Sequence, residues 1–298
     1  VPKALYGRTN GILILLRCVF TSAAPVVLGL VLDSLGGVQH VFLLQGGLGL
    51  LMLASISAGW WASSQAVQAA AGTVSRVPRS SQPTEKVAEH MAYRDLLSGD
   101  CRATLVRTAG LCSFIGMLIG AYNILLPVVS LALDIPVAHL ALSMGLCYGT
   151  AGSFSVLGGK AVDHNGHRTT MVSAMLLLAL GHVVLAALAL VGTDCATPVL
   201  VVAAILLGLG DSLASPLRGA LKNDYADSVR RWAHNCGRDE RMAIARSFAL
   251  LDVILDVVGV VYPIGLGLCA TCFSATLASC IFAGFGILGA LLAYLSTI

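Results

Sequence analysis

The sequence predicts an all-α membrane protein, a polytopic bundle of about eight transmembrane helices. Of its 298 residues, 57% are hydrophobic and only 11% carry a charge, whereas soluble domains carry about 25% charged residues. Mean hydropathy is +0.87. Long apolar runs alternate with short polar stretches, and Lys and Arg collect in every second stretch. This combination is typical of a chain that crosses a bilayer repeatedly.

The apolar runs are each long enough for a membrane helix, which needs about 20 mostly apolar residues. In chain order they are 10–32, 38–61, 104–133, 139–158, 169–192, 198–221, 245–268 and 270–296. Trp60 and Trp61 close the second run, where indole rings favour the membrane interface. The stretch 63–103 is rich in Ser, Gln, Thr, Pro and mixed charge, which predicts a linker loop.

The basic residues predict the orientation of the chain. Most lie before the first run, in 63–103, in 160–168 and in 222–244; Arg107, Arg218 and Arg246 lie near the ends of apolar runs that adjoin these stretches, and only Arg17 lies well inside a run. The stretches around Asp33, Asp134 and Asp194 have none. With about eight spans, every basic stretch falls on one face of the membrane, and the positive-inside rule makes that face cytoplasmic. We therefore expect an integral, multi-pass protein with the linker, 160–168 and 222–244 in the cytoplasm.

The polar stretch 159–168 carries a recognisable motif, with Gly159, Asp163, Gly166 and Arg168 separated by three, two and one residues. This spacing resembles the loop motif of the major facilitator superfamily, a family of helical membrane transporters. Such a resemblance implies that the chain corresponds to helices five to twelve of that fold. It starts without Met, so we expect it to be N-terminally incomplete.

An internal repeat supports the same resemblance. Arg8 precedes Pro25 by seventeen residues, and Arg246 precedes Pro263 by seventeen. Each Pro opens a Pro-x-x-Leu-Gly sequence, which ends at Gly29 and Gly267 respectively; these four Pro and Gly positions are expected to shape helix packing. Parallel repeats of this kind relate the two halves of major facilitator proteins. By resemblance, 1–62 holds the last two helices of the N-terminal half, 63–103 is the cytoplasmic linker, and 104–298 is the C-terminal six-helix half.

The motif suggests a gate. Gly159 allows close helix packing, and Gly166 allows a turn with positive φ. By resemblance, Asp163 faces the start of the first span, with Arg218 or Arg168 completing an ion pair that locks the cytoplasmic side. The other interpretation is a charged, solvated loop. His164 and His167 stand where the family has basic residues, which fits a pH-sensitive gate or decay of a second motif copy.

Charged residues inside apolar runs are costly and are functional candidates. These are Arg17, Asp211, Asp252 and Asp256, which share a depth band at roughly 1.5 Å per residue. We expect Arg17 to pair with one or more of the carboxylates while another binds a proton or a cationic substrate group. The alternative is a buried ion pair that only sets helix packing. Asn123 could line a cavity or form an interhelical hydrogen bond.

The expected function is secondary-active transport of a small organic solute by alternating access, with H⁺ as a candidate coupling ion. The alternative is a non-transporting membrane sensor or scaffold on the same fold. No enzymatic activity is expected, because the sequence has no GxSxG, HExxH or Walker loop. We predict no cofactor, no metal ion and no nucleic-acid partner; the expected partners are the lipid bilayer and the transported solute.

Overall fold

The computed structural model describes residues 10–15, 18, 99–188, 191, 193–272 and 274–295. All of them belong to one compact unit, which comprises Val1–Val27 and His90–Ile298. The predicted second span and most of the predicted linker lie outside these residues. The division into 1–62, 63–103 and 104–298 therefore stays a prediction.

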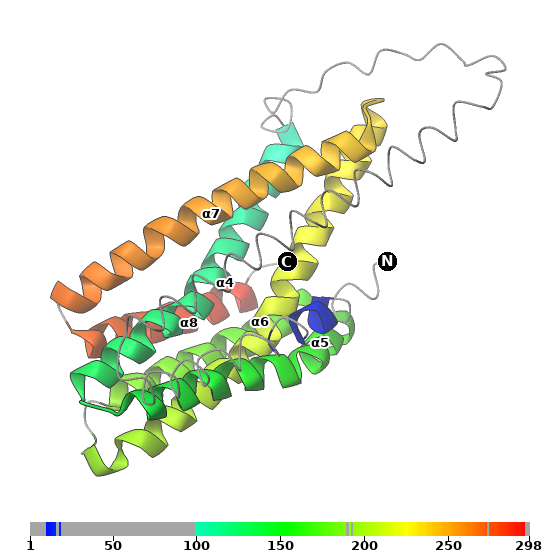
Figure 1. Cartoon of the computed structure of the whole chain (residues 1–298). Coiled ribbons are helices and arrows are strands. Elements are labelled where there is room, and N and C mark those ends of the chain that lie inside the picture. The colour runs from blue at the N-terminus through cyan, green and yellow to red at the C-terminus, as the bar shows by residue number, and fades with distance from the viewer. Residues whose placement is uncertain are drawn as a thin grey trace, which may run out of the picture. The chain divides into compact units, whose positions relative to one another are not determined.

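The described part of the chain is almost entirely helical and contains no strand (Figure 1). Its long helices, in order, are α4 (Gly99–Ala132), α5 (Val137–Ala187), α6 (Thr193–Asn235), α7 (Glu240–Cys272) and α8 (Ala275–Leu295). Within the described residues, five helices are long and apolar enough to cross a membrane. Three of them hold internal prolines, which are Pro127 in α4, Pro198 and Pro216 in α6, and Pro263 in α7; membrane helices tolerate proline because neighbouring groups satisfy the freed carbonyls. The all-α, membrane-type fold is thus confirmed.

Helix α5 holds both predicted runs 139–158 and 169–192 up to Ala187. Its 51 residues would extend about 76 Å if straight, more than twice the thickness of a bilayer core. The helix breaks at Gly166, whose φ of 76° and ψ of 170° are non-helical and belong to a region that only glycine adopts readily. The Thr170 hydroxyl donates a hydrogen bond of 2.9 Å to the Gly166 carbonyl.

The two halves of α5 run in opposite directions along α6. Four close contacts define this: Cys147–Gly208 and Gly158–Ser212 in the first half, and Leu178–Gly210 and Gly181–Leu207 in the second. In the first half of α5, a higher residue number in α5 contacts a higher residue number in α6. In the second half, a higher residue number in α5 contacts a lower one in α6. The first half is therefore parallel to α6 and the second antiparallel, and Figure 1 shows both beside it. Both Gly208 and Gly210 lie at close contacts between α6 and α5.

Helices α4, α6 and α7 are longer than the apolar runs that predicted them. The stretch 222–244, expected to be a loop, is helical except at 236–239, and 160–168 is helical except at Gly166. Helix α4 begins at Gly99, inside the predicted linker. Polar residues that leave the bilayer can continue a helix, because propensity and i, i+4 pairs support it without apolar burial. Hydropathy marks only the part of a helix that lies in lipid.

Packing is uneven around the bundle. Helix α4 contacts α5, α6, α7 and α8, and α6 contacts α4, α5 and α7. Within its apolar window α7 is only 17% buried, against 44% to 56% for the other spans. It therefore presents most of its surface outward, including Val257, Val260 and Ile264.

The described N-terminal residues pack against α5 and α6. The Gly11 carbonyl accepts a hydrogen bond of 2.8 Å from Ser155, and the Asn10 side chain lies beside Gly219. Arg17, Pro25 and Gly29 lie outside the described residues, so their predicted roles stay predictions.

Two of the predicted helix-packing positions are described, Pro263 and Gly267. Among the described residues, a Cβ placed on Gly267 would meet nothing within 4 Å. Its partner in the repeat, Pro263, is within α7.

Candidate functional site

A buried carboxylate lies where α4 and α6 meet. Asp211 of α6 is 7% exposed. It accepts a hydrogen bond of 3.1 Å from the hydroxyl of Tyr122 on α4 and a second, short one from Ser215 one turn along α6. Tyr122 itself is 1% exposed. The predicted intramembrane acid Asp211 is therefore held by hydroxyl groups from two helices.

A second polar pair adjoins this carboxylate. The Tyr148 hydroxyl of α5 donates a hydrogen bond of 2.6 Å to the side-chain oxygen of Asn123 on α4. The rings of Tyr122 and Tyr148 meet edge to face, with 6.1 Å between their centroids. Of the two alternatives for Asn123, the interhelical hydrogen bond is the one observed. Side chains from α4, α5 and α6 thus form one polar cluster, Asp211, Ser215, Tyr122, Asn123 and Tyr148, within apolar helices.

The Asp211 carboxylate of this cluster is a group that can bind and release a proton. A carboxylate at mid-helix in lipid costs about 2.5–3.5 kcal/mol, and the Tyr122 and Ser215 donors offset part of that cost for the ionised form. When protonated, Asp211 becomes a donor itself, so the hydroxyl groups around it must reorient. A change in protonation is thereby coupled to the contact between α4 and α6.

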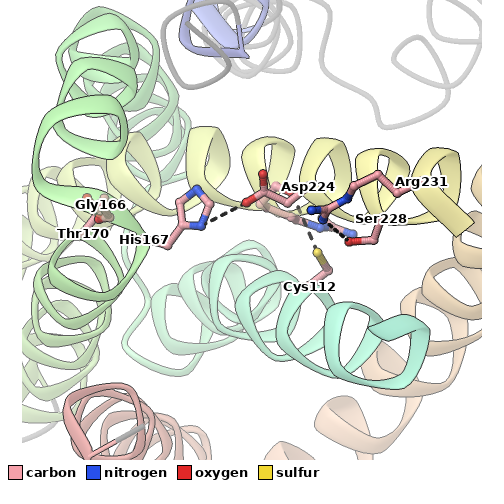
Figure 2. A network of polar contacts seen from close by, with 8 residues as sticks. Cys112, Gly166, His167, Thr170, Asp224, Ser228 and Arg231 are labelled. Atoms are coloured by element: carbon pink, nitrogen blue, oxygen red, sulfur yellow. Dashed lines mark hydrogen bonds and ion pairs between the residues drawn. The ribbon is translucent and has the colours of Figure 1, made fainter. Parts of the chain in front are cut away.

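The motif residues meet other helices at the Gly166 break (Figure 2). His167 Nδ1 lies 3.3 Å from Asp224 Oδ2 of α6, an ion pair when the imidazole is protonated. Arg168 donates a hydrogen bond to the backbone carbonyl of Tyr294, and its guanidinium carbon lies 5.2 Å from the centre of that ring. Tyr294 is in the last turn of α8, where carbonyls have no partner within the helix. The break is thus tied to both α6 and α8.

These contacts are weak ones. The side chains of His167 and Asp224 are 28% and 27% exposed, and exposed ion pairs contribute only about 0–1 kcal/mol. Contacts of this strength can form and break during a conformational cycle. Helix α5 is therefore joined to its neighbours here by links that need little energy to open.

Arg218, the predicted partner of Asp163, lies beside α4. The Arg218 Nη1 atom would lie 3.3 Å from a Cβ placed on Gly116 of α4. Its side chain lines a cavity of about 100 Å³ between α4, α6 and α7. Arg218 follows Asp211 by seven residues, which places both on the face of α6 that meets α4. The gate interpretation therefore depends on His167, Arg168 and Asp163, with Arg218 directed elsewhere.

The two carboxylates of α7 are not buried with Asp211. Asp252 forms an ion pair of 2.6 Å with Lys222 of α6, and its side chain is 54% exposed. Asp256, one turn later, is also exposed. The i, i+4 spacing places Asp252 and Asp256 on one face of α7, and that face is exposed. Asp252 pairs with Lys222, whereas the predicted pairing of Arg17 with one or more carboxylates lies outside the described residues.

One further buried ionisable group is His182 of α5, which is 0% exposed. Its Nε2 lies 3.5 Å from the Leu118 carbonyl of α4, and its ring centroid lies 5.8 Å from that of Phe282 on α8. His182 contacts helices on both sides as a packing residue. In the described part of the chain, no three His, Cys, Asp or Glu side chains gather as a metal site.

Several residues of the site were not predicted from the sequence. Asp224 lies in the stretch expected to be a loop, and Tyr148 and Tyr262 gave no sign of a role. Ser215 could have been found, because it follows Asp211 by four residues and so shares its helix face. The tyrosines could not, because only the packing of α4, α5 and α7 brings them to α6.

Comparison with models of known protein families gives no match, and comparison with characterised protein sequences gives no match either.

Proposed function

We propose that the chain is part of a secondary-active transporter that carries a small organic solute by alternating access, with H⁺ as the coupling ion. The observation that carries this proposal is Asp211, a 7% exposed carboxylate bonded to Tyr122 across the contact between α4 and α6. A membrane helix has little reason to retain a costly acid unless its protonation or ligand binding is used.

Two other features support the proposal. The weak contacts of His167 and Arg168 suit a gate that opens and closes in each cycle. Glycines where α5 meets α6 bring backbones together without long side chains between them, which gives smooth surfaces for small helix shifts. The spacing of Gly159, Asp163, Gly166 and Arg168 resembles the major facilitator motif, and we propose that type of fold for the whole protein.

The test is transport by the full-length protein reconstituted in proteoliposomes. A panel of organic anions, cations and neutral solutes is offered with and without an imposed proton gradient. We expect solute accumulation driven by the gradient, and an initial rate at least ~10-fold lower in Asp211→Asn, because removal of a charged hydrogen-bond acceptor costs about 1.5–3 kcal/mol.

The matched control is Asp227→Asn, since Asp227 lies on the same helix but pairs with Arg230 in an exposed i, i+3 ion pair. This variant should transport at the wild-type rate. Gradient-driven transport that is equal in Asp211→Asn and wild type would refute the role of Asp211. No transport of any solute by a folded protein would favour a sensor or scaffold.

A further inference from the structure

The cavity between α4, α6 and α7 contains buried polar atoms that have no partner. Its volume is about 100 Å³, and its lining includes Arg218, Tyr262, Ser113 and Gly116. In the described structure, Arg218 Nε and the Tyr262 hydroxyl are buried without a hydrogen bond. Buried donors almost always find an acceptor, so two unsatisfied ones that line the same cavity indicate a missing ligand.

The charge of Arg218 determines what kind of ligand fits. Within the described residues it forms no ion pair, while the nearby cation Lys222 is already neutralised by Asp252 at 2.6 Å. Asp211, two turns back along α6, accepts hydrogen bonds from Tyr122 and Ser215. The guanidinium of Arg218 therefore has no ion-pair partner at the cavity among the described residues, and burying a cation is expensive unless an anion joins it.

The shape of the site further limits which anions can bind. A guanidinium presents planar donors that match the oxygens of a carboxylate or phosphate, and the Tyr262 hydroxyl adds a donor from the α7 side. The cavity holds only a few heavy atoms, since one water takes up about 30 Å³ of liquid. Its lining also includes the apolar side chains of Met117, Leu255 and Val258.

From these observations we propose that the α4–α6–α7 cavity binds a small oxyanion, with Arg218 and Tyr262 as its donors. The oxyanion is a carboxylate or phosphate group, belonging either to a soluble solute or to an anionic lipid. If the proposed transport function is correct, the substrate class is an organic anion whose acidic group occupies this cavity. That last step rests on the proposed function, whereas binding itself does not.

The experiment measures binding without transport. Purified full-length protein in nanodiscs of zwitterionic lipid is mixed with acetate, and transfer of saturation from protein to the acetate methyl group is recorded by NMR. We expect a clear signal that added inorganic phosphate reduces by competition. In nanodiscs that contain anionic lipid, an unchanged signal identifies a soluble oxyanion as the occupant, and a reduced signal identifies the lipid headgroup.

Variants test whether the acetate signal comes from binding in the α4–α6–α7 cavity. Arg218→Gln should weaken acetate binding at least ~10-fold, and Tyr262→Phe about 3- to 10-fold, because charged hydrogen bonds contribute more than neutral ones. Arg231→Gln is the matched control, since Arg231 lies on the same helix with its guanidinium at 3.4 Å from Ser228; it should bind as wild type does. Helical content by circular dichroism verifies folding, and Tyr262→Phe keeps the test decisive if Arg218→Gln is unstable.

An acetate signal of the same strength in wild type and in the folded Arg218→Gln or Tyr262→Phe protein would overturn the proposal. So would the lack of any acetate or phosphate effect in the folded wild-type protein. Oxyanion binding that depends on Arg218, in a protein that transports nothing, would leave the cavity assignment intact and reject only the transport function.

Discussion

At the residue scale, Asp211 and Arg218 divide the polar face of α6 into two different environments. Asp211 is surrounded by hydroxyl donors from Tyr122 and Ser215. Arg218, two turns later, lines a cavity with the Tyr262 hydroxyl. One site can hold or release a proton and the other can hold an anion, with both facing α4. A solute anion and a proton bound on the same helix face would neutralise the two charges together, which lowers the cost of moving them through lipid.

The Tyr122 hydroxyl should stabilise the contact between α4 and α6. Tyr122→Phe leaves Asp211 with one donor fewer, and we expect a loss of about 0.6–2 kcal/mol in stability, the range of interhelical hydrogen bonds in membranes. The measurement is the midpoint of thermal unfolding in detergent. Tyr294→Phe is the control, because Arg168 contacts the Tyr294 ring and backbone carbonyl; equal midpoints in the two variants would contradict this assignment.

The backbone conformation of Gly166 could be predicted from the sequence alone. A glycine between charged residues and two apolar runs predicts a positive-φ turn, and the observed φ is 76°. The sequence did not reveal that the turn is a single residue. Helix continues on both sides because Asp163, His164 and Asn165 tolerate helical geometry once tertiary contacts support it.

At the element scale, close packing of α5 on α6 depends on glycine. The Gly158 backbone lies directly against the Ser212 carbonyl, and Gly208 lies against Cys147 and Thr150. The apolar runs located these helices, because the part of a helix that spans lipid needs about 20 apolar residues. It could not fix their ends, nor which face of α7 turns inward, since lipid-facing and core-facing residues are equally apolar. The outward position of Asp252 and Asp256 is the consequence.

A methyl group on Gly158 should separate the two helices. In Gly158→Ala the new Cβ would overlap the Ser212 backbone, and overpacking of this kind costs about 1–3 kcal/mol. Gly110→Ala is the matched control, because a Cβ there meets nothing within 4 Å, and alanine is the better helix former by about 1 kcal/mol. We expect the unfolding midpoint to fall in the first variant and to hold or rise in the second; similar midpoints would argue against the packing.

At the scale of the whole molecule, orientation in the membrane is open to a direct measurement through two native cysteines. Cys195 and Cys236 are both exposed free thiols, one near the start of α6 and the other just after its end. If α6 crosses the bilayer, they lie on opposite sides. The positive-inside rule assigns Cys236 to the cytoplasm.

The measurement uses cells that express a variant with either Cys195 or Cys236 as its sole cysteine. A membrane-impermeant maleimide should label Cys195 in intact cells and Cys236 only after permeabilisation. Labelling of both residues in intact cells would show that α6 does not span the membrane. The reverse pattern would keep the span and invert the orientation.

Helices α6 and α7 extend well past the polar cluster, joined at their tips by the four residues 236–239 (Figure 1). The end of α6 lies about 36 Å beyond Asp211 at roughly 1.5 Å per residue. Because of this length, a tilt of α6 and α7 by about 5° about an axis through Asp211 would move the tip of the hairpin by about 3 Å. The start of α4 lies beside the hairpin, because Cys101 and Thr104 of α4 line a 290 Å³ cavity together with Tyr225 and Trp232 of α6. A small tilt inside the membrane would therefore become a displacement large enough for another molecule to sense outside it.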